Sequence, residues 1–319
     1  MDKRIDKNKK NIKIAKKALK EQKKQEKIET KTRNEKRKEE QKLKNKRKRK
    51  IMLIILITII LLAGIYARFI EPNFLKVNEI KLETDKITEN NHGLKIVHFS
   101  DLHYNSTINK SNIDKIINKI NLLKPDLLFF TGDLFEQTVI TTKEDAEVLT
   151  KAFNNLEATL GKYAVIGNHD IHNDYFANVL YDSGFTVLKN DYDLIYNKDN
   201  TPILVYGVDE LLFGEPEIKG IDEYKDSDIY KILLLHEPDY IDEVEFNFDI
   251  ALSGHSHNGQ VRIPFVYKLT LPEGSRNYYK PYYQVNDTDL YISEGIGCSL
   301  LNFRLFTPPS INLYRLNKK

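Results

Sequence analysis

The sequence predicts an α/β fold, a layered sandwich of two mixed β-sheets flanked by helices and preceded by one transmembrane helix. Apolar runs alternate with amphipathic helical segments from residue 94 onward, a pattern typical of parallel strands with covered faces. The second half of the chain is richer in strand, and a layered sandwich accommodates both halves. A run of 17 uncharged residues ahead of this region predicts the membrane helix.

The individual elements follow from residue spacing and from turn residues. Isoleucines at positions 113, 116, 117 and 120 recur at helical spacing, and Pro125 follows that segment. In the first half we expect strands over 94–99, 127–130 and 163–166, with helices over 112–123 and 143–160. In the second half we expect strands over 185–188, 193–196, 202–208, 232–235, 250–252, 290–293 and 311–316.

The uncharged run covers residues 51–67, and as a helix it would span about 25 Å, close to the roughly 30 Å of a bilayer core. With Arg68 snorkelling toward the head groups, residues 51–70 form a transmembrane anchor. A buried core helix is one alternative, but such helices seldom have a single polar side chain, here Thr58. A cleaved signal peptide is another, but it would not normally carry fifty residues ahead of its apolar run.

Charge is distributed unevenly along the chain. Residues 1–50 carry 24 Lys and Arg against 8 Asp and Glu, whereas the rest of the chain has a net charge of −13. Because basic residues at 44–50 abut the apolar run, the positive-inside rule predicts a cytoplasmic N-terminus and an extracellular C-terminal domain. We expect the basic tail to be disordered or a solvated helix, and the alternative is an arm on anionic lipid head groups. Nucleic acid is not expected as a partner, since no aromatic residues are interleaved to stack bases.

Five short motifs place metal-binding residue types directly after expected strands. They are Asp101-Leu102-His103, Gly132-Asp133, Gly167-Asn168-His169-Asp170, the lone His236, and Gly254-His255-Ser256-His257. Open α/β sheets bind ligands at the carboxyl ends of their strands, so these side chains are expected to converge. Asp101 and His103, two apart on an extended backbone, would project to the same side. Carboxylate, imidazole and amide donors without a thiolate suit Mn, Fe, Zn or Co, and there are enough for two adjacent ions.

The order of these motifs resembles the signature of the calcineurin-like metallophosphoesterase superfamily, over about residues 94–316. The likeness is greatest to a membrane-associated bacterial phosphodiesterase branch, through the stretches at 236–239, 254–262 and 293–297. Two positions depart from that branch. Asn258 stands where Gly is usual, and Glu294 stands where Arg is usual, which would weaken recognition of an anionic substrate.

The resemblance implies two divalent metal ions per chain, with Mn, Fe, Zn and Co not distinguished. One ion would be held by Asp101, His103 and His257 and the other by Asn168, His236 and His255, with Asp133 bridging them, His169 as acid and Asp170 as its orienting partner. A hydroxide bridging the metals would attack phosphorus in line. The acid histidine would protonate the leaving oxygen or stabilise charge.

The expected organisation is a basic tail over 1–50, an anchor over 51–70, a linker and entry strand over 71–93, and a metallophosphoesterase catalytic domain over 94–319. The resemblance implies a membrane-anchored phosphodiesterase or pyrophosphatase acting on a cell-envelope or extracellular phosphate ester, lipid-linked substrates included.

Alternatives stay open. A phosphomonoesterase or protein phosphatase is less favoured, because the Asp-Arg-Gly usual in protein phosphatases does not follow Gly132. A non-catalytic scaffold of the same fold would need no metal. The tyrosine-rich segment 265–283 is either ordinary hairpin packing or a lip over the metals.

Overall fold

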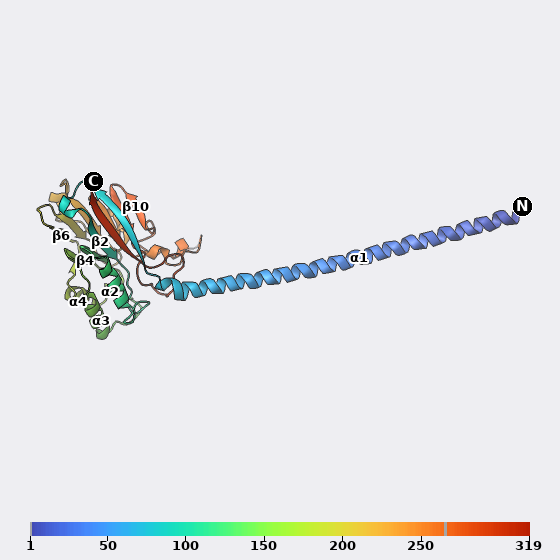
Figure 1. Cartoon of the computed structure of the whole chain (residues 1–319), viewed down its shortest axis with the longest axis horizontal. Helices are drawn as coiled ribbons and strands as arrows, with labels where there is room; N and C mark the ends of the chain where they lie inside the picture. Colours follow the sequence, from blue (N-terminus) through green and yellow to red (C-terminus); the bar gives the residue numbers. More distant parts are fainter. Residues whose placement is uncertain (1, 265–266) are drawn as a thin grey trace. The chain divides into compact units, whose positions relative to one another are not determined.

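The computed structural model describes residues 2–264 and 267–319, which divide into two compact units, Met1–Gly64 and Ile65–Lys319 (Figure 1). Helix α1 (Asp2–Ile65) is continuous, and its side chains from residue 6 to residue 62 are exposed. One window of 18 residues in the helical stretch Asp6–Asn73 has a mean hydropathy of 2.6, and 6% of that window is buried. By length and composition the helix is therefore able to cross a membrane, although a signal sequence would meet the same criterion.

The second unit contains two six-stranded sheets. The first has the strand order β1-β12-β2-β3-β4-β5. Its strands are β1 (Lys76–Thr84), β12 (Ser310–Lys318), β2 (Leu94–Phe99), β3 (Leu127–Thr131), β4 (Gly161–Val165) and β5 (Thr186–Val187). Strands β2 to β5 are parallel, whereas β12 runs antiparallel to β2 and parallel to β1. The sheet is therefore mixed.

The second sheet has the order β10-β11-β9-β8-β7-β6 and is also mixed. Its strands are β10 (Tyr282–Val285), β11 (Thr288–Ile292), β9 (Ile250–Ser253), β8 (Tyr230–Leu234), β7 (Ile203–Gly207) and β6 (Asp191–Ile195). Strands β7, β8, β9 and β11 are parallel, and the two edge strands are antiparallel to their neighbours.

Alternate residues of the strands enter different cores. In β2 and β3, Ile96 and Phe129 pack between the two sheets with Val205 of the second sheet, whereas Val97 and Phe130 face the other way. That outward face of the first sheet is covered by α2 (Ile113–Leu122), α3 (Lys143–Phe153) and α4 (Phe176–Asp182). Both faces of these strands are buried, which explains why their sequences are largely apolar, with Lys95 and His98 as the exceptions in β2.

The predicted fold class is confirmed, and the differences are local. The helix expected over 143–160 ends at Phe153, where the side-chain amide of Asn155 donates to the carbonyl of Lys151 and Leu156 turns into the core. Helix α4 was not expected. The outer face of the second sheet is covered by loops and by the 3₁₀ segment Pro238–Glu243.

Candidate metal centre

The seven residues predicted as metal ligands lie together at the carboxyl ends of strands from both sheets. Asp101 and His103 follow β2, Asp133 follows β3, Asn168 follows β4, His236 follows β8, and His255 and His257 follow β9. Six of the seven are buried, and Asn168 is half-buried. The candidate ligands of both sheets gather at one edge, because the central strands of each sheet run parallel and end there.

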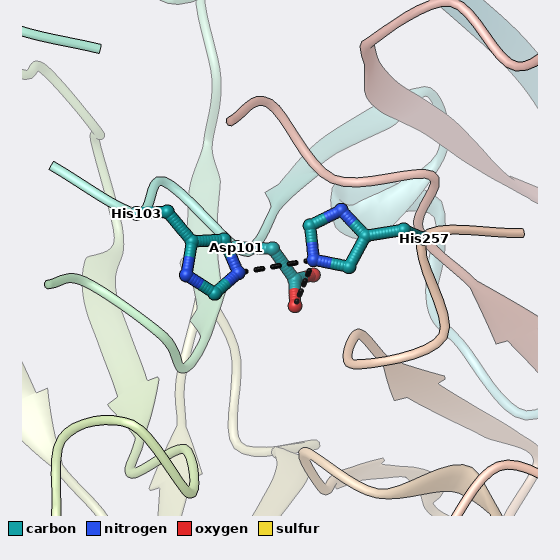
Figure 2. Close-up of side chains that lie close together, drawn as sticks. All are labelled: Asp101, His103 and His257. Atoms are coloured by element: carbon teal, nitrogen blue, oxygen red, sulfur yellow. Dashed lines mark hydrogen bonds and ion pairs between the residues drawn. The ribbon is translucent and has the colours of Figure 1, made fainter. Parts of the chain in front are cut away.

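One group joins Asp101, His103 and His257 (Figure 2). The Nε2 atoms of the two histidines face each other at 3.0 Å, and Nε2 of His257 lies 3.5 Å from Oδ1 of Asp101. The carboxylate oxygen Oδ2 of Asp101 is buried and has no hydrogen-bond partner among the described residues. Three possible ligand atoms, one from each residue, therefore lie within 4.8 Å of one another.

A second group joins Asp133, His236 and His255. Oδ2 of Asp133 lies 3.2 Å from Nε2 of His236 and 3.6 Å from Nε2 of His103, so this carboxylate stands between the two groups. Nδ1 of His255 lies 3.3 Å from Nε2 of His236. Oδ1 of Asn168 is a further buried oxygen that has no hydrogen-bond partner in the part of the chain that the structure describes.

Backbone carbonyls orient the histidines of the second group. Nδ1 of His236 lies 2.6 Å from the carbonyl oxygen of Thr131, and Nε2 of His255 lies 2.6 Å from that of Glu273. A ring nitrogen facing a carbonyl carries a proton, so in the neutral form of each ring the opposite nitrogen would present its lone pair to the site. This is the arrangement that metal-ligating histidines use in proteins.

The loops that carry the ligands are conformationally unusual. Asp101, His103, Asp133, His255 and His257 have φ values of 52°, 43°, 59°, 65° and 46°. The expectation of an extended backbone at Asp-x-His was therefore wrong, although both side chains do reach the same group. Left-handed non-glycine residues cost on the order of 1–3 kcal/mol each and cluster at functional sites.

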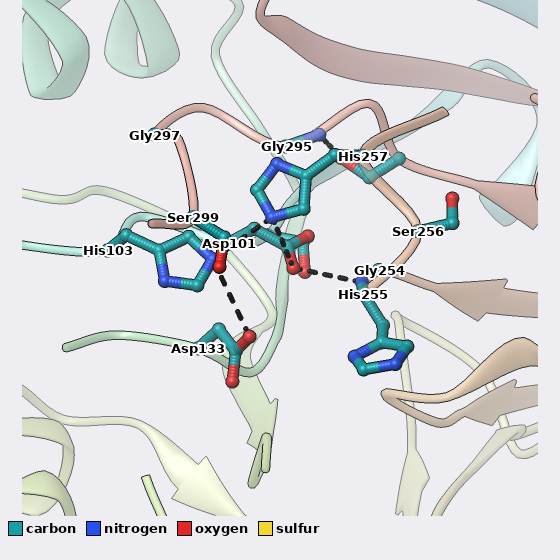
Figure 3. Close-up of polar contacts among 12 residues, drawn as sticks. Asp101, His103, Asp133, Gly254, His255, Ser256, His257, Gly295, Gly297 and Ser299 are labelled. Carbon is teal, nitrogen blue, oxygen red and sulfur yellow. Dashed lines mark hydrogen bonds and ion pairs between the residues drawn. The ribbon is translucent and has the colours of Figure 1, made fainter. Parts of the chain in front are cut away.

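Two motif glycines make room for the carboxylates. A Cβ added at Gly167 would lie 2.4 Å from Oδ1 of Asp133, and one added at Gly254 would lie 2.6 Å from Oδ2 of Asp101. Oδ1 of Asp101 accepts the backbone N–H of His255 at 2.9 Å, which ties the first motif to the last (Figure 3). Any side chain at these glycines would displace a proposed ligand.

The groups of the site shift one another's pKa values in both directions. Burial raises the pKa of Asp101, and against the effect of burial Asp133 raises the pKa of His236 well above its usual value. Burial raises the pKa of Asp133, but the neighbouring His236, His169 and His103 lower it well below its usual value. Burial and the neighbouring His236 lower the pKa of His255 to about 3, so this ring is neutral at pH 7, as a metal ligand must be. Together with the unpaired oxygens of Asp101 and Asn168, the oxygen and nitrogen donor set fits divalent metal ions.

The two residues predicted to act as acid and as its partner occupy different surroundings. His169 lies beside the first group, with its ring centroid 4.8 Å from that of His103. Asp170 is buried, and its carboxylate accepts the backbone N–H groups of Asp133 and Leu134 at 2.8 and 2.9 Å. Among the described residues, the carboxylate beside the His169 ring is that of Glu136. Asp170 therefore stabilises the loop after β3 through hydrogen bonds to its backbone.

Glu136 is a site residue that the motif analysis missed. Its carboxylate is buried, with Oε2 3.2 Å from Nδ1 of His103 and Oε1 3.6 Å from Nδ1 of His169. Burial alone lowers the pKa of His169, but Asp133 and Glu136 raise it to about 9. The sequence signal was present, since Glu136 stands three residues after Asp133 in the same loop.

Arg304 is a second residue that no motif indicated. It is fully buried, and its guanidinium donates to the carbonyls of Glu294 and Thr307 and faces Nδ1 of His257 at 3.2 Å. The side chain of Glu294 points elsewhere, with a carboxylate oxygen 2.9 Å from Nζ of Lys76. Glu294 is therefore a structural residue of this region and does not line the pocket described below.

The other departure from the family pattern, Asn258 in place of Gly, is explained by the backbone conformation at that position. Asn258 has φ 52° and ψ 30°, a left-handed conformation. Glycine adopts this region freely, and asparagine is among the residues that enter it most readily. Asn258 thus preserves the turn, and its side-chain oxygen accepts from Arg262 at 3.1 Å.

A pocket of about 480 Å³ lies over the two groups. Its polar floor includes His103, Asp133, Asn168, His169, His255 and His257, and its walls include Ala67, Leu212, Val261, Pro272, Leu300, Leu301 and Phe303. In the described part of the tyrosine-rich segment, residues 267–283, Pro272 lines the pocket and no tyrosine does. Phe265 and Val266 lie outside the described residues.

The chain is similar in sequence to known proteins. The YkuE metallophosphoesterase of Bacillus subtilis is 31% identical over 256 residues, covering 79% of this chain and 88% of that protein. The UDP-2,3-diacylglucosamine pyrophosphatase LpxG of Chlamydia muridarum is 27% identical over 311 residues, covering 80% and 93%. A transmembrane protein with a metallophosphoesterase domain from Danio rerio is 27% identical over 240 residues, covering 70% and 53%.

The family profile of calcineurin-like phosphoesterases matches residues 94–259, the part of the chain that holds all five motifs. Hydrolysis of phosphate esters with bound metal is the general activity of this family. The chain therefore belongs to the calcineurin-like phosphoesterase family.

Proposed function

We propose that this protein is a membrane-anchored phosphodiesterase or pyrophosphatase that uses two divalent metal ions to hydrolyse a cell-envelope or extracellular phosphate ester. The observation that carries the proposal is the pair of buried donor groups on either side of Asp133, at the floor of one pocket. Two cations about 3.5–4 Å apart suit attack on a phosphate diester, because both can bind its oxygens. The likeness to LpxG, a pyrophosphatase, supports this choice of bond.

In this proposal Asp101, His103 and His257 would hold one ion, Asn168, His236 and His255 would hold the other, and Asp133 would bridge them. When bound, the two ions would lower the pKa of a water molecule and bind the phosphate oxygens.

The chain's own residues would handle the leaving group. With a pKa of about 9, the His169 ring carries a proton on both nitrogens at neutral pH. Nδ1 lies 3.6 Å from Oε1 of Glu136, which leaves the Nε2 proton for transfer. A leaving oxygen in the pocket would receive that proton. Glu136 fixes the ring beside His103, and Asp170 holds the loop from which Asp133 projects.

Residues 51–70 would anchor the protein, with the basic tail, residues 1–50, in the cytoplasm against anionic head groups and the catalytic domain, residues 94–319, outside. The linker and entry strand over 71–93 would join them. The apolar, exposed helix segment and the existence of a transmembrane relative support anchoring.

The test is metal content and turnover of the full chain in detergent, with bis(p-nitrophenyl) phosphate compared with p-nitrophenyl phosphate. We expect two ions per chain and preference for the diester. Asp133→Asn should lose metal and turnover together, whereas Asp182→Asn, on the exposed end of α4, should lose neither. A fully metallated Asp133→Asn protein contradicts the bridging assignment.

Other results would favour the alternatives. Preference for the monoester would identify a phosphatase instead. Absence of both metal and turnover with Mn²⁺, Zn²⁺, Fe²⁺ and Co²⁺ would identify a scaffold.

A further inference from the structure

The pocket over the metal centre has an apolar rim that projects into solvent. Leu300, Leu301 and Phe303 line the pocket and are nevertheless 73%, 67% and 37% exposed. Phe306, on the same loop, is 68% exposed. We call these four residues the rim. Contiguous exposed apolar side chains beside a binding site mark an interaction surface, because their exposure to water is unfavourable.

The rim loop is attached to the segment that ends the apolar helix. The backbone N–H of Arg304 donates to the carbonyl of Ala67 at 2.9 Å, and the guanidinium carbon of Arg68 lies 6.0 Å from the ring centroid of Phe303. Ala67 itself lines the pocket. All of these residues belong to the second compact unit, Ile65–Lys319. The pocket wall thus includes Ala67, the last residue of the uncharged run, and the rim loop is hydrogen-bonded to it.

The composition of this segment is that of a membrane interface. Tyr66, Phe69 and Ile70 are 41%, 63% and 55% exposed, and Arg68 stacks on the ring of Phe69 at 5.1 Å. Tyrosine and snorkelling arginine side chains are enriched where a transmembrane helix leaves the hydrocarbon core. A span that ends at residue 70 therefore places Ala67, and with it the rim, at the level of the head groups.

We propose that the rim enters the bilayer surface and that the pocket receives the phosphate of an amphiphilic ester directly from the membrane. This inference rests on the proposed function, since it assigns the substrate class of the same site. The acyl chains of the substrate remain along Leu300, Leu301 and Phe303, while its phosphate reaches His103 and His257 at the pocket floor. Arg68 adds a positive charge at the same level, which suits anionic head groups.

The chain contains no tryptophan, so a single introduced tryptophan reports its own surroundings. Leu301→Trp and Phe306→Trp are made in the full chain and reconstituted in phosphatidylcholine and phosphatidylglycerol vesicles that carry brominated acyl chains. The matched control is Tyr196→Trp, which is 55% exposed but directly follows β6, at the amino ends of the parallel strands and so at the opposite edge from the metal centre.

We expect both rim tryptophans to lose roughly half or more of their emission, because interfacial side chains lie about 5–10 Å into the head-group and acyl boundary where the bromines are. The control tryptophan should lose none. Rim emission that is unquenched by bromine overturns the inference. So does a blue shift that depends on protein concentration instead of bromine, since it would indicate a second copy on the rim.

This readout needs no turnover, so the two proposals fail separately. Hydrolysis of a soluble diester without rim quenching would leave the proposed function standing and remove the membrane contact. Quenching without hydrolysis of any diester would support the membrane contact and contradict the proposed function.

Discussion

Gly254→Ala tests whether the last motif is packed against the first as closely as the structure indicates. An added Cβ would lie 2.0 Å from Oγ of Ser100 and 2.6 Å from Oδ2 of Asp101, whereas carbon atoms in contact are normally about 3.5–4.0 Å apart. Ser100 can rotate its hydroxyl away only by losing its donation to the carbonyl of Thr131 at 3.0 Å. Asp101 cannot yield freely, because it accepts the backbone N–H of His255.

The expected cost follows from these contacts. Loss of the Ser100 hydrogen bond costs about 1 kcal/mol, and forcing an extra methyl group into a packed site costs about 1–3 kcal/mol more. The variant should therefore lose roughly 2–4 kcal/mol of unfolding free energy, which lowers the melting temperature of a domain of this size by roughly 5–15 °C. Because Asp101 must shift, the variant should also bind metal more weakly.

The assay is thermal unfolding of the full chain in detergent with EDTA, followed by the near-ultraviolet circular dichroism of the tyrosines. The matched controls are Ser100→Ala and the double variant Ser100→Ala with Gly254→Ala. In the double variant the hydroxyl is already absent, so its destabilisation should be smaller than the sum of the two single effects by about 1 kcal/mol. Additivity within about 0.5 kcal/mol would show that the predicted contact does not exist.

Three further predictions concern the acid, its partner and a buried histidine. His169→Ala should retain its metal and lose about 10²- to 10⁴-fold in turnover of the diester, and loss of metal would contradict its placement outside the ligand set. Glu136→Gln removes the charge between two rings and should lower turnover or metal affinity about 10- to 100-fold. Glu147→Gln, on the exposed face of α3, should change neither. Equal turnover and equal metal affinity in the two variants would refute the role of Glu136. Burial lowers the pKa of His98 to about 3. As the pH falls, the unfolded chain therefore protonates His98 before the folded chain does. The unfolding free energy is unaffected by this histidine above about pH 6.5 and decreases as the pH falls toward 3. In denaturant titrations His98→Gln should reduce that loss by about 2 kcal/mol at pH 5, relative to pH 7, and an unchanged pH profile would contradict the burial effect.

The sequence by itself determined the family, the fold class and which side chains meet at the candidate metal centre. It did so because the relevant information is local. Each ligand stands within four residues of an apolar strand, and the carboxyl ends of parallel strands converge whatever the detailed packing. The strand over 94–99 is found with those bounds because its sequence is mostly apolar, as a strand with both faces covered requires.

Only the tertiary structure decided the contacts between distant segments. The pairing of β1 with β12 joins the two ends of the domain, and no local pattern specifies a partner so far away in the sequence. The same holds for Arg304 behind His257 and for the rim residues beside Ala67. Side-chain direction was equally beyond the sequence. Glu136 and Asp170 are both carboxylates near motif positions, but only the structure shows that Glu136 lies beside the His169 ring and that Asp170 accepts backbone N–H groups after β3. Residue types and strand ends are local properties, whereas the neighbours of a buried side chain depend on how the whole chain packs.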